Sequence, residues 1–189
     1  MAPLGEDDLI HDWNHQADGA PRTRPTATAL DDHGRLPPMT STQALHAAGQ
    51  SLWLDNITRD LLDSGTLQGY IDNLSVTGLT SNPTIFDHAI KNSSSYDAAI
   101  EKGLKAGKSG EDLFFDVALD DITRAADLFR PIYDRTCGVD GFVSLEVSPL
   151  LARDPTTTLA QVKDLAARAG RPNLFIKIPG TAEGLPAIE

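Results

Sequence analysis

Four side chains capable of chemistry follow four short apolar segments of this sequence. They are Asp55, Asn82, Glu146 and Lys177, and each lies at or just beyond the end of a segment with the composition of a β-strand. Carboxylates exchange protons, an amide orients hydroxyl groups, and an amine attacks carbonyl carbons. Because the carboxyl ends of parallel strands meet at one edge, we expect the four residues to lie at the same height and to form one site.

Lys177 stands among apolar residues in the segment NLFIKIP, residues 173–179. Burial there would remove hydration and favour the uncharged amine, which attacks carbonyl groups and forms a Schiff base. Glu146 could act through a bound water in the proton transfers by which the carbinolamine loses water. The resulting iminium is an electron sink, so a base on the adjacent hydroxyl, for which Asp55 is the candidate, could then break a carbon–carbon bond.

Each of these residues also has an ordinary structural interpretation. A lysine near a strand end is commonly a solvent-facing charge. Asp55 could cap the helix that follows it, and Glu146 could be an exposed residue in a loop. The site hypothesis therefore depends on the four residues taken together.

The strands that must position these side chains are predicted at residues 51–57, 75–81, 140–147 and 173–179. Side chains alternate between the two faces of a strand, so the sequence assigns each residue to a face. One face is aliphatic in all four segments, as packing against helices requires. The opposite face carries Asp55, Asn82, Glu146 and Lys177, and Thr80 shares it.

Helical patterns separate the predicted strands. They cover residues 58–73 with a break at Ser64-Gly65, and residues 83–91, 96–105, 110–135 and 157–169. The last has Asp154-Pro155 at its start and Gly170 just past its end, as expected for helix caps. Alternating strands and helices predict an α/β fold with a parallel sheet.

Composition narrows the classes of function. The 189 residues carry a formal net charge of -11, which provides no basic field for nucleic acid, although a few converging cations could still bind a small anion. No apolar run approaches the roughly 20 residues that cross a bilayer, and the amino terminus does not resemble a signal peptide, so we expect a cytoplasmic protein without a membrane partner. The single cysteine, Cys137, cannot form an internal disulfide.

The chain is predicted to divide at residue 38. Residues 1–38 are rich in Pro, Thr, Asp and Gly without an apolar period, so we expect a disordered extension, and Met39 is an alternative start of the protein. Residues 39–189 contain the regular pattern of strands and helices.

The motifs LWLDNITRDLL, VTGLTSNPTIF, GFVSLEVSPLLARD and NLFIKIPGTAEGLPAIE resemble those of transaldolases in the form common in actinobacteria, and together they span residues 51–189. The resemblance implies a (β/α)8 TIM barrel with Lys177 as the Schiff-base lysine. It implies further that Asp55 is the acid/base for carbon–carbon cleavage and that Glu146 is the partner of the catalytic water. Asn82 would position the dihydroxyacetone unit, with Thr80 and Thr181 as lesser candidates for substrate contact.

The implied reaction moves a dihydroxyacetone unit from sedoheptulose 7-phosphate to glyceraldehyde 3-phosphate in the pentose phosphate pathway. The partners would be sugar phosphates, and the resemblance implies neither a metal nor an organic cofactor. Fructose 6-phosphate aldolase, a related lyase that shares the barrel and the lysine but releases dihydroxyacetone, is the alternative.

The predicted strands number four, whereas a (β/α)8 barrel typically has about 250 residues and eight strands. We therefore expect the first four βα units of a barrel, in a truncated chain that is inactive or poorly folded alone. Its open sheet edges suggest another hypothesis, a non-catalytic half-barrel that self-associates. A doubly wound nucleotide-binding domain is disfavoured, because DNITRD replaces the glycine-rich loop expected after the first strand.

Overall fold

Four short parallel strands form the centre of a computed structural model that describes residues 38–188. Their bounds are β1 (Leu52–Asp55), β2 (Val76–Thr80), β3 (Val143–Glu146) and β4 (Leu174–Lys177). Each lies inside a predicted strand segment, so the four strand predictions are confirmed. The disorder predicted for residues 1–38 concerns a part of the chain that, except for Pro38, lies outside the described residues.

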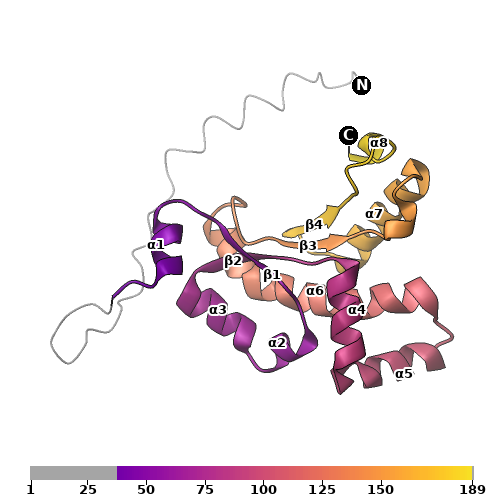
Figure 1. The fold of residues 1–189 in the computed structure, drawn as a ribbon, viewed down its shortest axis with the longest axis horizontal. Coiled ribbons are helices and arrows are strands. Elements are labelled where there is room, and N and C mark those ends of the chain that lie inside the picture. The colour runs from indigo at the N-terminus through magenta and orange to yellow at the C-terminus, as the bar shows by residue number, and fades with distance from the viewer. Residues whose placement is uncertain (1–37, 189) are drawn as a thin grey trace, which may run out of the picture. The chain divides into compact units, whose positions relative to one another are not determined.

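The strands are hydrogen-bonded in the order in which they occur in the sequence, β1-β2-β3-β4 (Figure 1). Each connection therefore moves one strand further in the same direction, as in a barrel. A doubly wound sheet would reverse this order at its switch point, and the four described strands show no reversal. The parallel α/β architecture is confirmed and is consistent with part of a TIM barrel.

Helices connect the strands and cover the aliphatic face of the sheet. Their bounds are α1 (Ser41–Ala47), α2 (Arg59–Asp63), α3 (Thr66–Leu74), α4 (Pro83–Asn92), α5 (Asp97–Lys105), α6 (Gly110–Arg135), α7 (Pro155–Ala169) and α8 (Leu185–Ile188), with 3-10 turns η2 (Ser94–Tyr96) and η3 (Pro149–Leu151). The helix α1 was not predicted, and a capping box between Thr40 and Gln43 stabilises its start. None of the described helices is both long and apolar enough to cross a membrane.

The register of the strands aligns one aliphatic row across the whole sheet. The row consists of Leu54, Leu79, Val143 and Leu174. These side chains face the helices, and α3, α6 and α7 contact the strands that they cover. The assignment of the aliphatic face from sequence alternation is thus confirmed.

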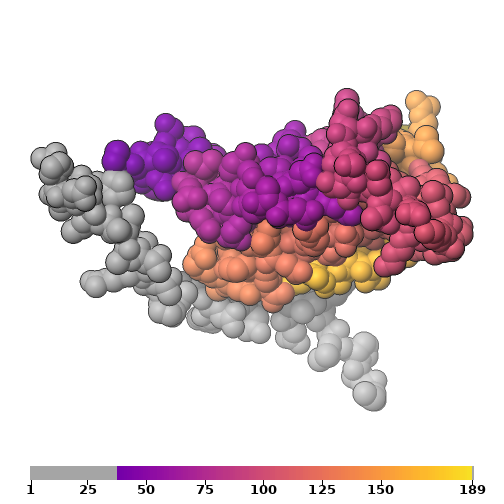
Figure 2. Space-filling view, turned by 90° about the horizontal axis from the view of Figure 1, so that it is seen from below, coloured from indigo at the N-terminus to yellow at the C-terminus, as the bar shows by residue number. Residues whose placement is uncertain are grey.

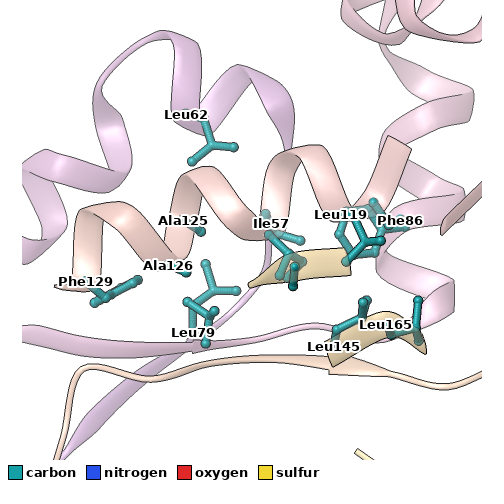
Figure 3. Packing of buried hydrophobic residues seen from close by; sticks show 14 of the residues in the cluster. Ile57, Leu62, Leu79, Phe86, Leu119, Ala125, Ala126, Phe129, Leu145 and Leu165 are labelled. Carbon is teal, nitrogen blue, oxygen red and sulfur yellow. The ribbon is translucent and has the colours of Figure 1, made fainter. Parts of the chain in front are cut away.

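The long helix α6 contributes the largest share of the core beneath this row. Its buried residues recur every three or four positions and include Phe115, Ala118, Leu119, Ile122, Ala125, Ala126, Phe129 and Ile132. They pack against Leu79 and Leu145 from the sheet and Leu62 from α2 (Figure 3). In the space-filling view of Figure 2, the purple and magenta segments lie against the orange ones that follow them in the chain. Complete burial of one such Leu or Phe side chain contributes about 1.5–3 kcal/mol.

The predicted caps of α7 are both present. The Asp154 side chain accepts a hydrogen bond from the Thr157 amide at 3.0 Å. Gly170 ends the helix in the left-handed region with φ of 58°, which glycine adopts without steric cost. Local sequence therefore sets where α7 starts and ends, and thus where β4 can begin.

An aromatic layer covers part of the opposite, inner face of the sheet. The Trp53 indole lies over β2 because Gly78 has no side chain there, and a Cβ at Gly78 would lie 2.4 Å from the indole. Trp53 stacks with Phe175 at 6.5 Å between ring centroids, and Phe175 stacks with Phe142 at 4.1 Å. Trp53 is 37% exposed and Phe175 is 48% exposed, so this layer is open in the described structure.

Candidate active site

The amine of Lys177 lies beside a carboxylate at the ends of two neighbouring strands. Lys177 and Glu146 are register partners on β4 and β3. The distance from Lys177 Nζ to Glu146 Oε2 is 3.2 Å, and the two side chains are 37% and 27% exposed. The amine is therefore ion-paired and only partly buried, which differs from the apolar burial expected from the strand sequence.

Side-chain alternation explains this difference. The apolar residues adjacent to Lys177, Ile176 and Ile178, point away from its face, and Ile176 packs on the core. Phe175, the preceding residue on the lysine's own face, is itself half exposed. Glu146 lies close enough to exchange a proton with the Lys177 amine directly.

Two hydroxyl groups continue the polar row from Lys177 across the sheet. Lys177 Nζ donates to Thr80 Oγ1 at 3.3 Å, and Ser144 Oγ donates to the same oxygen at 2.9 Å. Ser144 is 2% exposed and was not among the residues singled out from the sequence. The signal was present, because Ser144 shares a strand face with Glu146 two residues later. Thr80 is thus held by a buried partner while it contacts the amine.

Asn82 forms the cap of α4 as well as part of the site. Its Oδ1 accepts a hydrogen bond from the Ile85 amide at 3.0 Å, and Pro83 occupies the first helical position. One accepting position of the amide oxygen is therefore used by the cap, and the Nδ2 hydrogens have no hydrogen-bond partner among the described residues. An asparagine directly before such a proline is a capping signal that the sequence interpretation did not use.

An open pocket of about 920 Å³ lies at the carboxyl ends of the strands and is lined by Asp55, Asn82 and Glu146. Three of the four predicted residues share one height, because Asn82 lies two residues beyond Thr80, at the level of the Glu146–Lys177 pair. Asp55 differs from the expectation. It is the register partner of Thr80, which lies two residues before Asn82. Asp55 is therefore roughly 7 Å further from the carboxyl ends of the strands than the other three residues.

The charge of the pocket lining is acidic. It includes the carboxylates of Asp55, Asp60 and Glu146, and the described lining residues contain no Lys or Arg. Hydrogen bonds from the Ser95 and Ser93 hydroxyls hold the pKa of Asp60 below its ordinary value, so Asp60 remains anionic. The described part of the pocket therefore suits hydroxyl groups better than phosphate.

Thr181 lies apart from this pocket lining. Its hydroxyl donates to the Ala152 carbonyl at 2.6 Å and accepts from the Gly184 amide at 3.0 Å. It therefore ties the loop after β4 to the loop after η3. Within residues 38–188, no three His, Cys, Asp or Glu side chains are arranged to hold a metal ion.

Residues 52–189 match the family model described as Transaldolase/Fructose-6-phosphate aldolase. A transaldolase of Trichodesmium erythraeum is 45% identical over 140 residues, which are 74% of this chain and 37% of the relative. A transaldolase of Thermobifida fusca is 48% identical over 146 residues, 77% of this chain and 40% of the relative. A transaldolase of Mycobacterium leprae is 47% identical over 145 residues, 77% of this chain and 39% of the relative. The chain thus spans well under half the length of these relatives.

Proposed function

The chain belongs to the transaldolase/fructose-6-phosphate aldolase family, and we propose that the intact protein transfers a dihydroxyacetone unit from sedoheptulose 7-phosphate to glyceraldehyde 3-phosphate through a Schiff base on Lys177. The observation that carries this proposal is the 3.2 Å contact between Lys177 and Glu146 beside a pocket lined by Asp55 and Asn82. We place the reaction in the cytoplasm and in the pentose phosphate pathway.

The first half of the reaction forms the Schiff base. Glu146 accepts a proton from the Lys177 ammonium, and the free amine adds to the ketose carbonyl. A proton moves from nitrogen to oxygen to give the carbinolamine. Glu146, directly or through a water, returns its proton to the carbinolamine hydroxyl, which leaves as water, so an iminium on Lys177 and the Glu146 carboxylate remain.

The second half breaks and forms carbon–carbon bonds. Asp55 removes the proton from the hydroxyl on the far carbon of the bond to be broken, that carbon becomes the aldehyde of the departing erythrose 4-phosphate, and the bonding electrons pass to the iminium to give an enamine. The enamine then attacks the carbonyl carbon of glyceraldehyde 3-phosphate, and Asp55 returns the proton to the new hydroxyl. Hydrolysis of the iminium releases fructose 6-phosphate and restores the Lys177 amine.

The charge of the pocket supports one orientation of the sugar. With Asp55, Asp60 and Glu146 in its lining, the pocket accommodates the uncharged ketol end, and hydroxyl groups can donate to the carboxylates. The phosphate would bind to residues other than the described lining. Because the chain spans only 37–40% of the length of its relatives, we also propose that residues 1–189 alone do not catalyse the transfer reaction.

Borohydride trapping tests the proposed Schiff base. The intact protein is incubated with fructose 6-phosphate, reduced and digested, and the modified peptide is identified by mass spectrometry. We expect a single adduct on Lys177 and none in Lys177→Met, whereas Lys163→Met, which lies on α7, should be labelled like the unaltered protein. An adduct on another lysine, or none, would reject the mechanism.

A lyase that releases dihydroxyacetone is the second candidate, because the matching family model includes fructose 6-phosphate aldolases. The two reactions share the enamine and differ in whether water or an aldehyde intercepts it. Dihydroxyacetone released from fructose 6-phosphate without an acceptor aldehyde would favour the lyase. Turnover that depends on the acceptor would favour the transferase.

Self-association of this chain is a further candidate, which the exposed rings of Trp53 and Phe175 favour. Each of the edge strands β1 and β4 has one strand neighbour in the described structure. A second copy could cover the aromatic layer and pair with these edges. Light scattering separates the outcomes, since a compact dimer of the 189-residue chain would support the idea and a monomer would exclude it.

A further inference from the structure

A buried arginine lies between two residues that line the pocket, Thr58 and Asp60, and takes no part in the chemistry proposed above. Arg59, the first residue of α2, is 8% exposed. Its Nε donates to Asp121 Oδ1 at 2.9 Å, and its Nη2 donates to Asp120 Oδ2 at 2.7 Å. Both acids belong to α6, so two charged hydrogen bonds fix the start of α2 to the central helix of the core.

Tyr96 holds the same arginine from the other side. Its ring lies under the guanidinium, with 4.9 Å between the ring centroid and Arg59 Cζ, and its hydroxyl accepts a hydrogen bond from the Arg59 amide at 2.8 Å. Tyr96 is completely buried and ends η2, the turn that follows α4. Both the backbone and the side chain of Arg59 are therefore fixed.

The residue after Arg59, Asp60, also binds the segment around η2. The hydroxyls of Ser93 and Ser95 donate to its carboxylate. Asp60 and Ser93 line the pocket, whereas Arg59 and Tyr96 are buried and are not among its lining residues. Two consecutive residues at the start of α2 thus bind residues 93–96, the segment that follows α4.

Burying the charged groups of this cluster costs free energy, which is hard to explain if stability is the only role of the cluster. Desolvation offsets much of the attraction in a buried ion pair, and well-packed apolar residues often stabilise as much or more. Asp121 is completely buried, and its Oδ2 has no hydrogen-bond partner of good geometry among the described residues. The cluster does, however, impose a defined orientation through directional bonds, which apolar packing would not.

We propose that Arg59, Tyr96 and Asp121 form a positioning cluster that sets the distance between Asp55 and Asn82 across the pocket. Asp55 is four residues before Arg59, and Asn82 caps the start of α4, which Tyr96 follows at the end of η2. The inference rests on the proposed function, in which Asp55 breaks the carbon–carbon bond. Loosening the cluster should impair that step more than adduct formation, which depends on Lys177 and Glu146 on other strands.

The test uses Tyr96→Phe in the intact protein, which removes the hydroxyl that accepts from the Arg59 amide and keeps the ring. We expect kcat for transfer to fall by about tenfold to a hundredfold, as small displacements of reacting groups do. At saturating fructose 6-phosphate, the rate of borohydride-trapped adduct on Lys177 should remain unchanged. Tyr70→Phe on α3, whose hydroxyl has no described hydrogen bond, is the matched control and should change neither rate.

The possible outcomes separate the two proposals. An unaltered protein that forms no adduct would overturn both. Suppose instead that the unaltered protein forms the adduct. If Tyr96→Phe then has the same kcat and adduct rate as the unaltered protein, or if both rates fall by the same factor, the positioning role is wrong and the proposed function stands. If Tyr96→Phe does not fold, Asp120→Ala removes the exposed carboxylate that accepts from Arg59 Nη2, and so loosens the same arginine without opening a buried cavity. A selective loss of kcat in that variant supports the cluster, and an unchanged kcat overturns it.

Discussion

Glu146 and Lys177 lie opposite one another on neighbouring parallel strands, with 3.2 Å between the carboxylate oxygen and the amine. Both side chains are partly exposed, and ion pairs in such surroundings contribute only about 0.2–1 kcal/mol to stability. The pair is thus of little use as a structural bond. Its position at the strand ends, next to an open pocket, fits proton transfer to and from the amine.

Replacing the carboxylate should therefore affect chemistry far more than stability. In the intact protein, we expect Glu146→Gln to slow formation of the trapped adduct by roughly 10²- to 10⁴-fold, the usual contribution of a general acid–base group. The melting temperature should barely change. Glu101→Gln breaks an exposed pair with Lys105 and should leave the adduct rate as it was. Equal adduct rates in the two variants would exclude Glu146 from the proton transfers.

The cap made by Asn82 allows its two roles to be separated. Asn82→Ala loses the acceptor for the Ile85 amide and should lower the free energy of unfolding by about 1 kcal/mol. Asn82→Asp keeps an acceptor at the helix start, so stability in urea denaturation should be retained. Both variants lose the Nδ2 donor, and we expect a raised KM for the donor sugar in each. If only Asn82→Ala showed the raised KM, capping rather than substrate contact would be the role of Asn82.

The aromatic layer on the inner face depends on a missing side chain. A Cβ at Gly78 would lie 2.4 Å from the Trp53 indole, so Gly78→Ala must displace that ring. We expect a loss of about 1–3 kcal/mol in the free energy of unfolding, as for other overpacked sites. Gly69→Ala in α3, where the nearest atom would be 4.0 Å away, should be neutral or stabilising. In a Trp53→Ala background, which lacks the ring, Gly78→Ala should cost much less, and an equal penalty in both backgrounds would contradict this explanation.

The pH dependence of stability should include a contribution from the cap of α7. Hydrogen bonds from the Thr157 hydroxyl and amide hold the pKa of Asp154 below its ordinary value of 3.8. Because the folded-state pKa is the lower one, this contribution is present above pH 3.8 and is lost as the pH falls through the folded-state value. Asp154→Asn keeps an acceptor but cannot titrate.

The measurement is the melting temperature of each variant between about pH 5 and pH 2.5, a range in which the pH falls through the ordinary aspartate pKa of 3.8. Asp154→Asn should lose less melting temperature on acidification than the unaltered chain. Asp97→Asn changes an exposed carboxylate that has no described hydrogen bond and should follow the unaltered curve. Superimposable curves for all three proteins would show that the cap does not contribute.

The sequence alone determined the local features of this protein. Alternation within NLFIKIP and GFVSLEV assigned Lys177 and Glu146 to the inner face, and the capping residues Asp154 and Gly170 marked both ends of α7. The family motifs were equally visible, and the match over residues 52–189 confirms them. Such features depend on residues a few positions apart, whose side-chain directions and hydrogen bonds follow from the local backbone.

Only the tertiary structure decided how distant segments meet. The strand register placed Glu146 beside the Lys177 amine, set Asp55 one inward position lower, and left the lysine partly exposed where the sequence predicted burial. The packing of α2 on α6 buried Arg59 against Asp121, a contact that no local pattern indicated. Register and helix packing are fixed by the whole core, because a shift of one residue would turn every inner side chain toward the helices.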